Sequence, residues 1–91
     1  MSSHDATMNG LREALRAELA TRYRVDQANL ADDTELFSSG LVDSLGVMEV
    51  VGLVERETGR SVPATAITLE NFDSIARILA FARSLSAGKS A

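Results

Sequence analysis

The sequence predicts an all-α fold, a small bundle of three main helices plus one short helix. Three observations point to this class. Alanine, the strongest helix former, occurs 13 times, whereas aromatic residues, which favour strands, make up 4% of the chain. Apolar residues recur at steps of three and four in three segments. No two segments alternate apolar and polar residues as paired strands do.

The length of 91 residues fits one domain. We therefore expect a single domain over residues 1–91, with an ordered core at about 8–85. Residues 1–7 and 86–91 are small and polar, so we expect flexible tails there. The lone His4 falls in the first tail and is not a candidate for metal binding or base catalysis, because such work needs oriented neighbours.

The first expected helix covers about residues 8–23. One face of it carries the apolar residues Met8, Leu11, Leu15 and Leu19. Residues 24–43 have no sustained period and are rich in Asp, Ser and Gly, which favour turns and caps. A loop of this length must be pinned to a small domain, so we expect Leu30, Leu36 and Phe37 to point inward.

The second expected helix covers about residues 44–58 and is closed by Gly59. Its core stripe consists of Val47, Val50, Val51 and Val54. Leu45 and Met48 lie in another arc, which also carries Glu49. Two apolar residues on a charged face are either ordinary exposed side chains or part of a docking surface.

The rest of the chain predicts a short helix and a last main helix. Pro63 keeps the residue before it extended, and residues 64–69 fit one short helical turn. From about Asn71 a new period of three and four begins and ends before Gly88. Its apolar residues are Phe72, Ile75, Ile78, Leu79, Ala82 and Leu85.

Composition excludes several classes of function. Without cysteine, the chain has no disulfides, thiolate metal sites or thiol nucleophile, which fits a reducing compartment. The first residues lack a basic, then apolar leader, and no stretch approaches the roughly 18 apolar residues of a membrane span. We therefore expect a cytoplasmic protein with no membrane partner.

The formal net charge of −4 is unevenly distributed. Between Asp26 and Asp73 the chain has ten acidic and two basic residues. Nucleic acid is not an expected partner, because binding it needs clustered Lys and Arg. The acidic centre fits a protein partner with a basic surface, although solubility alone would explain it equally well.

The junction of the long loop with the second helix carries the candidate chemistry. Asp43 is a good N-cap, and Ser44 follows in the first turn, where unpaired N–H groups and the helix dipole stabilise an anion. Alternatively, the two residues only cap a helix. No G-x-S-x-G motif surrounds Ser44 and no His or Lys base lies near it in sequence, so we expect no nucleophilic catalysis.

Three stretches carry a family pattern over about residues 8–85. They are Asp33-Thr34-Glu35-Leu36-Phe37, Gly40-Leu41-Val42-Asp43-Ser44-Leu45 and Glu70-Asn71-Phe72-Asp73-Ser74-Ile75. At these separations the chain resembles the phosphopantetheine-dependent carrier proteins, namely the acyl carrier proteins and their aminoacyl or peptidyl relatives. The resemblance implies an acyl-carrier-protein-like bundle.

The resemblance also implies a cofactor. Ser44 would be esterified with 4′-phosphopantetheine from coenzyme A by a magnesium-dependent phosphopantetheinyl transferase. The thiol at the end of this arm would hold an acyl or aminoacyl group as a thioester. Because the cofactor supplies the thiol and the transferase supplies the base, the domain itself is expected not to be an enzyme.

The same resemblance implies a partner surface on a monomeric carrier. Asp43 would help in recognition by the transferase as well as cap the helix. Leu45 and Met48 match positions that contact partner enzymes, and Glu49 and Glu55 match acidic positions that meet basic surfaces. Further partners would be an adenylating ligase or acyltransferase and downstream biosynthetic enzymes.

The chain departs from the fatty-acid pattern at three positions. Gly46 and Arg56 stand where acidic residues are common, and Gly52 stands where a larger apolar residue is common. These departures favour a dedicated secondary pathway. Two alternatives stay open: an unmodified adaptor, which would need no hydroxyl at position 44, and a carrier excised from a larger synthase. The identity of the cargo and the presence of a sheltering cavity are also open.

Overall fold

The computed structural model describes residues 3–86, and every regular element within them is helical. The main helices are α1 (Ser3–Tyr23), α2 (Ser44–Thr58) and α4 (Ile75–Ser86), with the short α3 (Leu69–Phe72) before α4. Two single turns of 3₁₀ helix, η1 (Gln27–Asn29) and η2 (Ala64–Ala66), lie in the connections. The predicted all-α bundle is confirmed.

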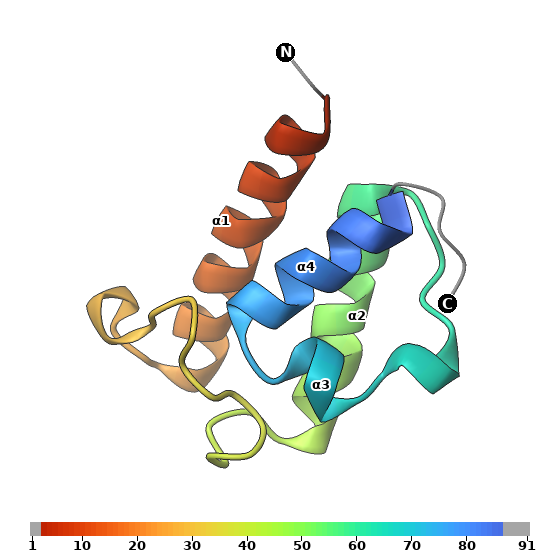
Figure 1. The fold of residues 1–91 in the computed structure, drawn as a ribbon. Coiled ribbons are helices and arrows are strands. Elements are labelled where there is room, and N and C mark those ends of the chain that lie inside the picture. The colour runs from red at the N-terminus through yellow and green to blue at the C-terminus, as the bar shows by residue number, and fades with distance from the viewer. Residues whose placement is uncertain (1–2, 87–91) are drawn as a thin grey trace.

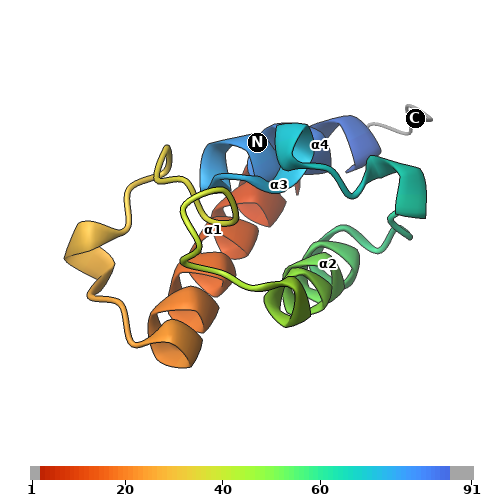
Figure 2. The same ribbon diagram turned by 90° about the horizontal axis from the view of Figure 1, so that it is seen from below.

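The three main helices pack against one another, and α3 lies against α4 (Figure 1). The connection from α1 to α2 forms a wide excursion on one side of the bundle, as the view from below shows (Figure 2). This excursion returns to the bundle just before α2 begins, so its conformation determines how the chain enters that helix.

Helix α1 begins earlier than predicted. It starts at Ser3 rather than near Met8, so residues 3–7 belong to the helix and the predicted start of this helix is wrong. No proline or glycine interrupts residues 3–7, so the helical backbone hydrogen bonds can extend back to Ser3. Of the other predicted tail residues, Ser86 is the last residue of α4, and residues 1–2 and 87–91 lie outside the described part of the chain.

The last predicted helix is divided in two. Its first residues form α3 and its main part forms α4, with a break at residues 73–74. The carbonyl of Asp73 accepts a hydrogen bond from the Leu36 N–H (2.8 Å), and the Ser74 hydroxyl oxygen accepts one from the Arg77 N–H (3.1 Å). A tertiary contact therefore uses the Asp73 carbonyl, and a new cap starts α4.

The core lies where α1, α2 and α4 meet. Its fully buried side chains include Leu11, Leu15, Leu19, Val50, Val54, Ile75, Ile78 and Phe72. The predicted α2 stripe is confirmed at Val50, Val51 and Val54, whereas Val47 is only half-buried. Leu53, which the pattern missed, is also buried, because α2 packs against both α1 and α4 and needs a wider apolar face.

The long connection is anchored as expected. Leu30 and Leu36 are fully buried, and Phe37 is half-buried against the core. Polar contacts add to this anchoring, because the Arg16 guanidinium donates to the carbonyls of Gln27 and Leu30. The Ala76 N–H in the first turn of α4 donates to the Asp32 carbonyl (2.8 Å). The loop is therefore held by both α1 and α4.

Candidate functional site

Ser44 is the first residue of α2 and is exposed to solvent. The residue before it caps the helix, because Oδ1 of Asp43 accepts a hydrogen bond from the Gly46 N–H (3.0 Å). This confirms the predicted capping role of Asp43. The hydroxyl of Ser44 lies in the first turn of a 15-residue helix, where the positive end of the dipole stabilises an attached phosphate.

An apolar groove of about 250 Å³ opens beside Ser44. Its walls come from the loop, α2 and the segment around α3, and they are formed by Phe37, Val47, Ile67, Thr68, Leu69 and Phe72 together with Ser44. The groove is smaller than the roughly 300–1,000 Å³ of pockets that enclose drug-sized ligands. It offers room for a short apolar group next to whatever Ser44 carries.

Asp73 holds the segment that leads to Ser44. Its Oδ1 accepts hydrogen bonds from the backbone N–H groups of Phe37 (2.8 Å) and Ser38 (2.9 Å), and Oδ2 accepts one from the Ser38 hydroxyl (2.7 Å). The bonds from Ser38 hold the pKa of the Asp73 carboxyl below its ordinary value, because they favour the ionised form. The last turn of the loop is thus attached to the start of α4.

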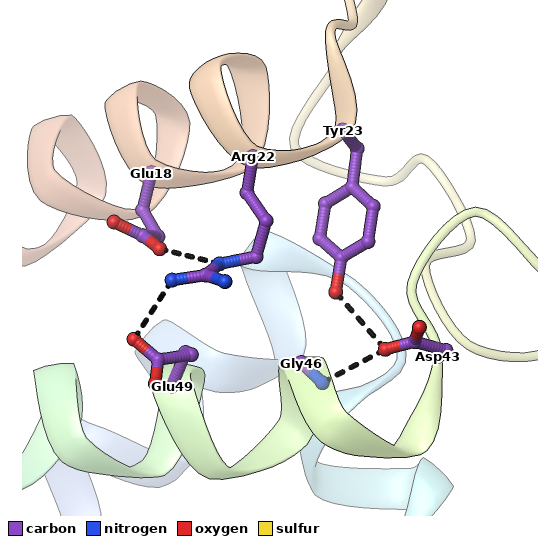
Figure 3. A network of polar contacts seen from close by, with 6 residues as sticks. All are labelled: Glu18, Arg22, Tyr23, Asp43, Gly46 and Glu49. Carbon is purple, nitrogen blue, oxygen red and sulfur yellow. Dashed lines mark hydrogen bonds and ion pairs between the residues drawn. The ribbon is translucent and has the colours of Figure 1, made fainter.

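Tyr23, a residue that the sequence analysis did not single out, completes the site. It is the last residue of α1, and its hydroxyl lies 3.3 Å from Oδ1 of Asp43 (Figure 3). Burial, followed by the neighbouring carboxylate of Asp43, raises the pKa of the Tyr23 hydroxyl above its ordinary value. No local signal marks this residue, since a tyrosine at a helix end resembles any other amphipathic side chain.

An ion-pair network lies next to this contact. The Arg22 guanidinium bonds to Glu18 through Nε (2.7 Å) and to Glu49 through Nη2 (3.1 Å), joining α1 to α2 (Figure 3). The hydrogen bond to Glu18 raises the pKa of Arg22 above its ordinary value. Glu49 is exposed, but Arg22 partly neutralises its charge before any partner arrives.

The predicted partner residues lie in different settings. Leu45 and Met48 are 80% and 61% exposed, so two large apolar side chains face solvent within one turn of Ser44. Glu55 lies further along α2 and is half-buried. Its Oε2 accepts a hydrogen bond from the Val62 N–H (2.8 Å), an intramolecular contact that the sequence did not reveal. Glu55 therefore anchors the connection after α2.

Among residues 7–86, no cluster of three or more His, Asp or Glu side chains is placed to hold a metal ion. In the same range, no helix combines the length and the apolar character that a membrane crossing requires.

The fold and the site define a class. A small helical bundle that presents an exposed serine at the first turn of its second helix, beside an apolar groove, has the form of a carrier domain. Comparison with known families agrees: the family described as phosphopantetheine attachment site matches residues 13–82, and the chain belongs to it. Its cofactor is covalently attached 4′-phosphopantetheine. No curated protein and no solved structure matches the chain.

Proposed function

We propose that this chain carries acyl or aminoacyl intermediates as thioesters on a phosphopantetheine arm attached at Ser44. The observation that carries the proposal is the exposed position of Ser44 at the start of α2. An enzyme can reach this hydroxyl without unfolding the bundle. The ordered loop before Ser44 and the helix cap formed by Asp43 hold this hydroxyl in a defined place.

The attachment step requires little of the carrier itself. The Ser44 oxygen forms a phosphodiester with the pantetheine phosphate of coenzyme A, the pyrophosphate bond breaks, and adenosine 3′,5′-bisphosphate leaves. The hydroxyl proton passes to a base on the transferase. The positive end of α2 stabilises the phosphate that results. The domain presents the nucleophile and catalyses nothing, in line with the non-catalytic role of its family.

The groove beside Ser44 bears on the cargo. Its walls are mostly apolar side chains, and its volume of about 250 Å³ suits a short acyl or apolar aminoacyl group better than a long chain. Cargo that enters the groove gains hydrophobic stabilisation and is shielded from water. A highly charged cargo would gain nothing there.

The partners are a phosphopantetheinyl transferase, an adenylating ligase or acyltransferase, and downstream enzymes of a dedicated secondary pathway in the cytoplasm. The docking surface is formed by Leu45, Met48 and Glu49, with Asp43 next to the modified serine. The weak acidic character of this surface supports the pathway assignment, because Gly46 and Arg56 stand where acidic residues are common. A small, partly electrostatic interface lets the carrier leave after each step.

Intact mass measurement after incubation with coenzyme A and a broad-specificity transferase tests the attachment. The wild-type chain should gain one phosphopantetheinyl group, and Ser44→Ala should gain none. Ser61→Ala is the matched control, since it removes a hydroxyl from an exposed serine outside the site and should be modified like the wild type. A wild-type chain that stays unmodified would favour the adaptor alternative instead.

A further inference from the structure

Tyr23 reaches across from the end of α1 to the residue that precedes Ser44. Its hydroxyl and the Gly46 N–H share one acceptor, Oδ1 of Asp43, at 3.3 and 3.0 Å (Figure 3). Both contacts use the same carboxylate oxygen, which leaves Oδ2 for a partner molecule. Asp43 and Ser44 are both exposed, so this second oxygen lies on the surface that a modifying enzyme must approach.

Gly46 is fitted to Tyr23. A Cβ atom at position 46 would overlap the Tyr23 hydroxyl oxygen and would lie 2.6 Å from Cγ1 of Val42, closer than real contacts allow. The phenol therefore occupies the space that any side chain at position 46 would need. The glycine that departs from the fatty-acid pattern is the complement of a tyrosine on another helix.

We propose that Tyr23 is a positioning residue for the modification of Ser44, because its hydroxyl fixes the Asp43 carboxylate in the orientation that the transferase recognises. The inference rests on the proposed function, in which Asp43 takes part in recognition. Without the hydroxyl, the carboxylate keeps only the backbone bond from Gly46 and can turn to other rotamers. The ring itself packs against the core and would stay in place.

The Tyr23→Phe variant isolates the hydroxyl, because the ring and its packing are kept. We expect kcat/KM of the transferase for this variant to fall about 3- to 10-fold, the range for a long, surface hydrogen bond to a charged group. Thr21→Val is the matched control: it removes an exposed hydroxyl two residues earlier on α1 and should leave the rate unchanged. Thermal unfolding of each variant should show that all of them are folded at the assay temperature.

A double-mutant cycle distinguishes positioning from a general structural role. If Tyr23 acts through Asp43, Tyr23→Phe should cause no further loss of rate in the Asp43→Ala background. A structural role would instead lower the rate by the same factor in both backgrounds. Equal rates for wild type and Tyr23→Phe would also overturn the positioning role.

A spectroscopic measurement tests the contact without the transferase. Tyr23 is the single tyrosine and the chain has no tryptophan, so the absorbance of tyrosinate reports this hydroxyl alone. Burial and the Asp43 carboxylate raise the pKa of Tyr23, and Arg22 acts in the opposite direction. Asp43→Ala should therefore lower the titration midpoint, and an unchanged midpoint would contradict the contact. A wild-type chain that is never modified would overturn the proposed function itself, and the positioning role with it, whatever the titration shows.

Discussion

Among single residues, Asp73 does most to hold the segment that leads to Ser44. Three hydrogen bonds from Phe37 and Ser38 end on its carboxylate, and its own carbonyl receives the Leu36 N–H. One side chain at the break between α3 and α4 thus orders the last turn of a loop more than 30 positions away, as the separation of 36 residues from Phe37 shows.

Asp73 makes stability depend on pH. Because its pKa is lowered in the folded chain from the ordinary 3.8, its contribution is present above that value and is lost as the pH falls through the folded pKa. We expect Asp73→Asn to cost about 1–2 kcal/mol of unfolding free energy at neutral pH. Urea unfolding at several pH values checks this: the difference between the two chains should narrow below about pH 4. Parallel pH curves would contradict the assignment.

Among the elements, the connection between α1 and α2 behaves as part of the core although it has little regular structure. Its anchors Leu30 and Leu36 are as buried as the core residues of the helices, and two of its carbonyls accept hydrogen bonds from Arg16 of α1. A domain of this size has few other contacts with which to keep the start of α2 in place. The connection is therefore a structural element in its own right.

Leu36→Ala tests this role. Leu36 is fully buried, so the substitution should cost about 2–4 kcal/mol, a large part of the stability of a small domain. Denaturant unfolding monitored by circular dichroism measures the loss. The matched control is Leu45→Ala, at an 80% exposed position, which should change stability by no more than about 0.5 kcal/mol. Similar losses for the two variants would show that the loop is not anchored by this residue.

At the scale of the whole molecule, the net charge of −4 does not show how many acidic side chains are already paired within the bundle. Part of the acidic charge is used in contacts within the bundle: Glu18 and Glu49 bind Arg22, Asp32 pairs with Arg12 (3.3 Å), and Glu55 accepts a hydrogen bond from the Val62 N–H. The acidic charge that remains near Ser44 for contacts with a partner is therefore small. The proposed docking surface therefore depends on the exposed Leu45 and Met48 as well as on charge.

Reversing one charge tests the electrostatic part. Glu49→Lys should slow modification by the transferase several-fold at low salt, with a smaller effect near 1 M salt, where the Debye length falls to about 3 Å. The control is the charge swap Arg22→Glu with Glu49→Lys, made together with Glu18→Gln because Glu18 also pairs with Arg22. The swap restores the ion pair between α1 and α2 while the reversed charge at position 49 stays on the docking surface. If the swap restores the full rate, the pair serves folding and Glu49 does not meet the partner.

By itself, the sequence determined the helices and the local chemistry of the site. The spacing of apolar residues predicted α1, α2 and α4, and the neighbouring Asp43 and Ser44 indicated the cap and the candidate attachment point. The buried loop residues Leu30 and Leu36 were also readable, because isolated apolar residues in a polar stretch need a place to dock. These signals act over at most about four residues, the reach of a helical turn or a cap.

Only the tertiary structure decided which distant residues meet at Ser44. Tyr23 and Asp43 are 20 positions apart, and Arg22 and Glu49 are 27 apart. Contacts with other segments likewise decide where α3 ends, what Glu55 binds within the chain and why position 46 needs glycine. Such contacts follow from how the helices pack, because side chains far apart in sequence meet only after the core has fixed the angles and distances between their elements.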